Sequence, residues 1–217
     1  MTNEENATSV SWQSITIAVA TLIAGAALLR SVFAALGNTL DFVALSSAVA
    51  AAWTLGWLFL RRLRPAELTL KLPTRQALKF SVVVGVIVSA AFVLGTLALL
   101  RIDGLSDAVH SAVTGAESTE LPVAFAMAVV TGAAEELFFR CALPRLWWSP
   151  VRGHVLSGIL YTLVTVATLN VALTAAAPIL AAVCSWAYLK TGRTATPLIA
   201  HATWTVVMVG LLPLFVG

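Results

Sequence analysis

The chain has 217 residues, of which 59% are hydrophobic and only 11% are charged, and its mean hydropathy is +0.94. Because a soluble domain carries about 25% charged residues, this composition excludes an ordinary soluble protein and predicts an all-α, polytopic membrane helix bundle. The formal net charge of +3 does not indicate nucleic-acid binding. The basic residues gather in a few loops, where such residues set membrane topology and contact anionic lipid headgroups.

About seven segments are apolar enough to be predicted as membrane spans, since a span needs about 20 largely apolar residues. They lie near 13–36, 40–60, 79–100, 121–143, 155–170, 171–189 and 195–216. We accordingly divide the chain into an N-terminal cytoplasmic segment (1–12), a first group of transmembrane helices (13–100) and a C-terminal core (120–216).

Basic residues in the loops predict the orientation of the bundle. The loop over 61–79 is the most basic part of the chain, and further basic residues follow the fourth and sixth predicted spans. Loops rich in lysine and arginine remain in the cytoplasm. We therefore expect a multi-pass protein of a bacterial plasma membrane, with the N-terminus in the cytoplasm and the C-terminus outside.

Three charged residues interrupt the fourth predicted span: Glu135, Glu136 and Arg140. A charge at the bilayer centre costs about 2.5–3.5 kcal/mol on insertion scales, so these side chains should face the bundle interior or a wet cavity. Glu136 and Arg140 are four positions apart and can pair on one helix face, whereas Glu135 points about 100° away. The pattern predicts one structural acid and one free acid suited to general-base catalysis. The alternative is that all three residues only fix the helix register.

Two later segments carry polar residues at the same spacing of four. His201 and Thr205 share one face of the last predicted span, and Tyr161 and Thr165 share one face of the fifth. A buried histidine is often a hydrogen-bonded core residue, but a membrane offers few partners to satisfy it, which favours a functional His201. A threonine within a span commonly bonds back to its own helix, so Thr165 alone indicates little.

In their order and spacing these segments resemble the CAAX prenyl protease and bacteriocin-processing family (CPBP, formerly Abi). Glu135 to Arg140 fits the Glu-Glu-x-x-x-Arg motif of that family. Tyr161 to Thr165 aligns with its second motif, in which an aromatic residue is followed four positions later by His. His201 to Thr205 resembles its third motif, His-x-x-x-Asn. The resemblance covers about residues 120–210.

The resemblance implies intramembrane endoproteolysis. Glu135 would be the base that activates water, with Glu136 as its neighbour and Arg140 as the orienting partner, and His201 would stabilise the oxyanion. Two positions depart from the family pattern, because Thr165 replaces the second-motif His and Thr205 replaces the third-motif Asn. Both hydroxyls can bond water or an oxyanion but cannot take up a proton near neutral pH.

Members of the family have been described both as metalloproteases and as glutamate proteases. A catalytic zinc usually takes three protein ligands, whereas this chain offers Glu135 and His201 and lacks the second-motif histidine and an HExxH motif. We therefore expect no tightly bound zinc and no other cofactor. The expected partners are membrane lipids and a membrane-associated peptide or protein substrate, and not nucleic acid.

Three functions follow from these observations. The first is an intramembrane endopeptidase of the CAAX type. The second, favoured by the substitutions at Thr165 and Thr205, is a catalytically degenerate relative that acts as a membrane binding or immunity partner. The third is a small transporter that uses the acids as a proton relay, but it would predict broken helices from two repeats, which the sequence does not show.

Overall fold

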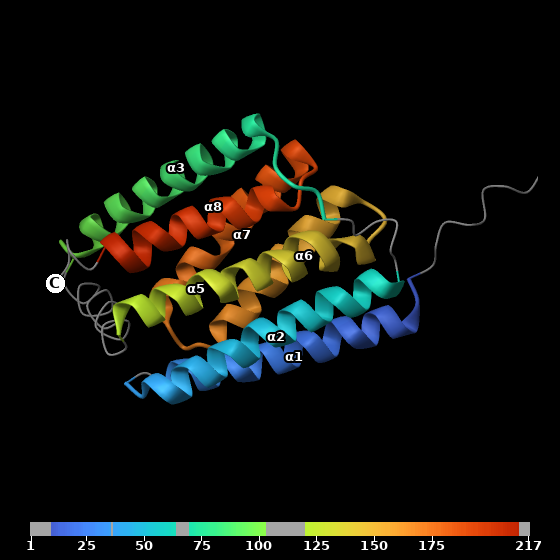
Figure 1. The fold of residues 1–217 in the computed structure, drawn as a ribbon, viewed down its shortest axis with the longest axis horizontal. Coiled ribbons are helices and arrows are strands. Elements are labelled where there is room, and N and C mark those ends of the chain that lie inside the picture. The colour runs from blue at the N-terminus through green and yellow to red at the C-terminus, as the bar shows by residue number, and fades with distance from the viewer. Residues whose placement is uncertain (1–9, 36, 64–69, 103–119, 213–217) are drawn as a thin grey trace, which may run out of the picture.

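The computed structural model describes residues 10–35, 37–63, 70–102 and 120–212 (Figure 1). Most of the predicted N-terminal segment, part of the basic loop over 61–79 and the end of the last predicted span lie outside these ranges. Helices are the only regular elements in the described part of the chain, which contains no strand, and this confirms the predicted fold class.

Seven α-helices make up most of the described structure, and each occupies one of the seven segments predicted from the sequence. They are α1 (Trp12–Ala34), α2 (Thr39–Leu63), α3 (Arg75–Leu99), α5 (Leu121–Glu136), α6 (Pro150–Val166), α7 (Val171–Thr191) and α8 (Ala195–Thr205). Three short irregular helices follow α5 and α8. These are the π-helix η1 (Leu137–Ala142), the 3₁₀-helix η2 (Leu143–Leu146) and the π-helix η3 (Val206–Leu211).

Five helical segments in the described ranges are long and apolar enough to cross a membrane. They are Trp12–Ala34, Thr39–Leu63, Arg75–Ala98, Leu121–Leu146 and Val171–Thr191. The fifth and seventh predicted spans correspond to shorter helices, α6 with 17 residues and the apolar segment Ala195–Leu211. The predicted boundaries of α6 were displaced toward the C-terminus, because the helix begins at Pro150, where Ser149 caps it, and ends at Val166.

The helices lie side by side along a common direction, and successive helices run in opposite senses (Figure 1). The α1–α2 hairpin packs on α5 through α2, and α5 packs on α8, which in turn packs on α3. The helices α6 and α7 form a second hairpin, and α7 also contacts α8. As a result α5 packs between α2 and α8, while α6 packs on η1 and η2, which follow α5. The polar residues at the end of α5 therefore lie inside the bundle.

The segments that connect the helices at one end of the bundle are rich in basic residues. Arg193 donates from Nη1 to the Leu72 carbonyl at 2.7 Å, and the Lys71 N–H donates to Thr194 Oγ1 at 3.3 Å, so the turn between α7 and α8 is joined to the segment before α3. The start of α1, the end of α2 and the start of α6 lie at this same end (Figure 1). The basic residues in the described helix ends and connections at this end are Arg61, Arg62, Lys71, Arg75, Lys79, Arg145, Arg152, Lys190 and Arg193.

An aromatic cluster fixes η1 against the α1–α2 hairpin. Trp53 of α2 is fully buried, with its ring centroid 5.3 Å from that of Phe138 and 4.9 Å from that of Phe139. The Trp53 ring fits because α1 has a glycine opposite it: a Cβ on Gly25 would lie only 2.0 Å from the indole. Aromatic pairs of this kind stabilise a core beyond their buried area. The cluster therefore holds the segment that carries the charged residues.

Candidate active site

The acid pair lies where α5 changes into a π-helix. Glu135 and Glu136 are the last two residues of α5, and Arg140 lies within η1. A second π-helix, η3, begins directly after Thr205 at the end of α8. Short π-helical turns are rare and often occur at functional sites. The spacing of apolar residues did not indicate either of them, because a local change in helical pitch leaves no mark in the sequence pattern.

Glu136 is held by two cationic or potentially cationic partners. Its side chain is fully buried, and Oε2 lies 3.2 Å from Arg140 Nε, which is the predicted pairing of residues four positions apart. The two groups are within ion-pair distance, although their relative orientation is not that of a hydrogen bond. The other oxygen, Oε1, lies 2.8 Å from Nδ1 of His201 on α8. The contact between Glu136 and His201 was not anticipated from the sequence.

This contact assigns the proton on the imidazole of His201. A carboxylate in an ion pair with arginine can only accept a hydrogen bond, so Nδ1 donates to Glu136. Nε2 then faces α5 at Gly132, where a Cβ would lie 3.0 Å from Nε2. A glycine at this position therefore lets the imidazole ring approach the helix. Sequence reasoning missed Gly132, although a glycine three residues before a charged pair within a helix was the available signal.

Glu135 has a different environment from its neighbour. Its side chain is 9% exposed, and Oε2 accepts one hydrogen bond, from the Tyr161 hydroxyl of α6 at 3.0 Å. Within the described ranges no cation forms an ion pair with it. Glu135 therefore lacks the charged partners that enclose Glu136, and its role as the free acid stays a prediction.

Tyr161 connects the two halves of the charged cluster. Its hydroxyl reaches Glu135, while its ring lies under the Arg140 guanidinium, with 4.4 Å between Cζ and the ring centroid. Cation–π contacts of this kind stabilise a desolvated guanidinium. A hydrogen bond joins α6 to η1: the Ser157 hydroxyl donates to the Phe139 carbonyl. The sequence had marked Tyr161 only as the aromatic residue of the second motif, and its contact with Glu135 requires the packing of α6.

The two threonines that replace family residues differ in their bonding. Thr165 is buried, and its hydroxyl donates to the Tyr161 carbonyl at 2.9 Å, so its proton is used within its own helix. Thr205 is also buried, one helical turn after His201, and its hydroxyl makes no hydrogen bond with any residue in the described ranges. The Thr205 hydroxyl can therefore donate a hydrogen bond to a bound substrate, whereas the Thr165 hydroxyl already donates to the Tyr161 carbonyl.

Residues 117–207 match a family model that is described as Rce1-like, type II CAAX prenyl endopeptidase. This segment is similar to the Rce1-like family. The match includes all three motifs, from Glu135 to Thr205, and confirms the family inferred from them. No curated protein and no solved structure significantly matches the chain.

A resident zinc ion does not fit the side chains at this site. In the described part of the chain no three His, Cys, Asp or Glu side chains gather as a metal site would require. Nδ1 of His201 is bonded to Glu136, and the guanidinium of Arg140 beside Glu136 would repel a cation. Since a catalytic zinc usually takes three protein ligands, we derive no catalytic step through a metal. The expectation that zinc is not tightly bound stays a prediction.

Replacing Arg140 tests whether the ion pair holds the bundle together. We expect Arg140→Met to lower the free energy of unfolding by about 3–5 kcal/mol, because it leaves the buried Glu136 carboxylate without its counter-charge. The double substitution Glu136→Gln with Arg140→Met should recover most of this loss. The measurement is the thermal unfolding midpoint in detergent. Arg152→Met, at an exposed arginine on α6, is the matched control and should leave the midpoint unchanged. Equal midpoints for Arg140→Met and Arg152→Met would contradict the assignment.

Proposed function

We propose that this protein is an intramembrane endopeptidase in which Glu135 activates a water molecule to attack a peptide bond of a membrane-associated protein or peptide. The observation that carries the proposal is the division of the acid pair. Glu136 is fully buried between Arg140 and His201, whereas Glu135 is 9% exposed, has no ion-pair partner in the described ranges and accepts a single hydrogen bond. A general base must be reachable by the proton that it removes, and only Glu135 satisfies this condition. The match to the Rce1-like family supports the same reaction class.

In the proposed reaction Glu135 removes a proton from water as the water oxygen attacks the carbonyl carbon of the scissile bond. The tetrahedral intermediate then breaks at its C–N bond, and Glu135 returns the proton to the leaving amine. The products are a carboxylic acid and an amine, so the step consumes one water molecule and needs no other reactant. The Tyr161 hydroxyl, at 3.0 Å from Oε2, orients the carboxylate during both proton transfers.

His201 is the proposed donor to the oxyanion. Because Nδ1–H is donated to Glu136, donation from Nε2 as well requires the protonated ring, which the hydrogen bond to the Glu136 carboxylate stabilises. A preorganised donor at this point is worth about 2.7–4 kcal/mol in transition-state stabilisation. The unbonded hydroxyl of Thr205, one turn further along α8, supports the same oxyanion. Glu136 and Arg140 thus act as positioning residues for His201 and do not touch the substrate.

The proposed setting is a bacterial plasma membrane, with the N-terminus in the cytoplasm and the C-terminus outside. This orientation follows from the basic end of the bundle, since basic loops remain on the cytoplasmic side. Lipids and a membrane-associated peptide or protein substrate are the proposed partners, and neither zinc nor another cofactor takes part.

The alternative is a catalytically degenerate relative that binds a membrane or peptide partner. One observation favours it: the Thr165 hydroxyl donates to the Tyr161 carbonyl and so cannot donate to water in place of the family histidine. The two functions make opposite predictions for cleavage, and substitutions at Glu135 and at the two threonines separate them.

The variant Glu135→Gln tests the proposed base. We expect it to lower kcat/KM for hydrophobic fluorogenic peptides, prenylated and unprenylated, by about 100- to 10,000-fold, since an amide cannot accept the proton from water. The assay uses the full chain in liposomes, with and without a chelator, which should have no effect. Glu120→Gln, at an exposed glutamate immediately before the same helix, is the control and should retain full activity. Undiminished cleavage by Glu135→Gln would overturn the proposal.

The double substitution Thr165→His with Thr205→Asn tests the alternative. If the protein is a peptidase with a reduced site, restoring both family residues should raise the cleavage rate, by up to about 100-fold for a new group that holds water. If the natural chain is inactive and only the double variant cleaves, the degenerate role is correct. Thr162→His is the matched control, because Thr162 lies on the same helix and also bonds back to it, through the Gly158 carbonyl. It should leave cleavage unchanged in either case.

A further inference from the structure

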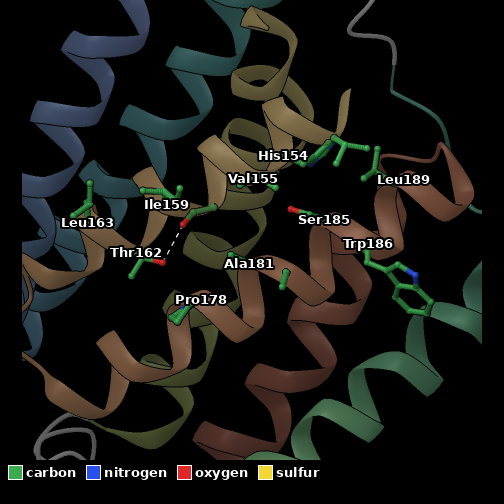
Figure 2. Close-up of a pocket in the computed structure, with 13 residues that line it drawn as sticks. His154, Val155, Ile159, Thr162, Leu163, Pro178, Ala181, Ser185, Trp186 and Leu189 are labelled. Atoms are coloured by element: carbon green, nitrogen blue, oxygen red, sulfur yellow. Dashed lines mark hydrogen bonds between the residues drawn. The ribbon is translucent and has the colours of Figure 1, made fainter. Parts of the chain in front are cut away.

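A groove of about 550 Å³ lies between α6 and α7 (Figure 2), and its lining does not include the residues of the charged cluster. Its floor is made of small residues: a Cβ on Gly158 would already touch Ala181 at 3.4 Å. Its walls are large apolar side chains that are exposed on the outside of the bundle. They include Val155, Ile159 and Leu163 of α6 and Trp186 and Leu189 of α7. The groove therefore faces the space that lipid occupies.

The length of the groove matches one leaflet of a bilayer. On α6 its lining runs from Val151 to Leu163, which is about 18 Å at 1.5 Å per residue. On α7 it runs from Pro178 to Leu189, which is about 16 Å by the same measure. The hydrocarbon core of a bilayer is about 30 Å thick, so each length is close to half of it. An extended hydrocarbon chain of one leaflet would fill the groove from end to end.

One end of this apolar groove contains two polar atoms without partners. Nδ1 of His154 and Oγ of Ser185 are buried and make no hydrogen bond with the residues that the structure describes. Both side chains are more than nine-tenths buried, and Figure 2 shows them near Leu189, with Pro178 and Leu163 toward the opposite end. The third polar side chain of the lining, Thr162, is satisfied by the Gly158 carbonyl at 2.9 Å (dashed in Figure 2). Because buried polar atoms nearly always have partners, this end indicates a ligand with oxygen atoms.

The same end of the groove lies at the basic end of the bundle. Arg152 and Lys190 are exposed and adjoin the lining residues Val151 and Leu189, one on each helix. Trp148, immediately before the cap of α6, is 84% exposed. Exposed tryptophans and basic residues characterise the headgroup level of a membrane, and basic pockets between membrane helices bind anionic headgroups. The polar end of the groove is thus at the depth of phosphate and glycerol.

We propose that the groove is a binding site for one acyl chain of an anionic phospholipid. The chain lies along the apolar lining, the glycerol and ester oxygens meet His154 and Ser185, and the phosphate lies between Arg152 and Lys190. A prenylated peptide fits these observations less well. Its peptide portion would lie at the basic end of the groove, whereas the carboxylate of Glu135 is on the other side of α6, bonded to Tyr161. The site is independent of peptidase activity.

Quenching of Trp186 by brominated lipid tests the site directly. The full chain in detergent is titrated with phosphatidylglycerol carrying one brominated acyl chain, and the signal is the difference between the natural chain and Trp186→Phe. We expect saturable quenching. Ala182→Phe should weaken the binding at least tenfold, because Ala182 is exposed on the groove wall and the new ring fills the groove without entering the core. Val19→Phe, at an exposed valine of α1, is the control and should leave the dissociation constant unchanged.

Two further measurements test which ligand occupies the groove. Brominated phosphatidylcholine with the same chains should bind several-fold more weakly, and the double variant Arg152→Gln with Lys190→Gln should lose this preference. Ala182→Leu serves as a second groove variant if Ala182→Phe does not fold. Linear quenching that is equal in the natural chain and the groove variants would overturn the site. Equal binding of both lipids would overturn the phosphate contact. A farnesylated peptide that displaces the lipid with micromolar affinity would assign the groove to the substrate instead.

Discussion

The buried carboxylate of Glu136 is the constraint on which the rest of the site depends. A charge enclosed in a membrane bundle has to be paired, because leaving it alone is strongly destabilising. Arg140 pairs with it from η1 and His201 from α8, while Tyr161 of α6 supports the guanidinium through its ring. One carboxylate thereby fixes the relative positions of three helical segments. Glu135, the adjacent residue, does not take part in this pairing, and its freedom is what makes a catalytic role reasonable.

The helix α6 separates the charged site inside the bundle from the apolar groove on its outer face. Tyr161 faces inward to Glu135 and Arg140, whereas Gly158 and Thr162 face the outer groove. A hydrolytic site in a membrane has to admit water on one side of a helix and exclude it on the other. The satisfied hydroxyl of Thr162 fits the dry side.

Much of this arrangement could be predicted from the sequence, because it depends on local periodicity. The spacing of Glu136 and Arg140 is enough to predict their pairing on one helix, and the apolar runs are enough to locate seven helices. The contact between His201 and Glu136 could not be predicted, since it depends on how closely α8 approaches α5 at Gly132. Spacing also cannot tell which imidazole nitrogen bonds to the acid, and it gives no sign of the change to a π-helix after Glu136.

The most direct measurement of the central claim is carboxyl labelling of the natural chain in liposomes with dicyclohexylcarbodiimide, read out by peptide mass spectrometry. The reagent is apolar and modifies accessible carboxyl groups within membranes. We expect Glu135 to be labelled and Glu136 not to be, because Glu136 is fully buried between Arg140 and His201. We also expect Glu136 to become reactive in Arg140→Met. Labelling of Glu136 in the natural chain, equal to that of Glu135 or greater, would contradict the division of the acid pair.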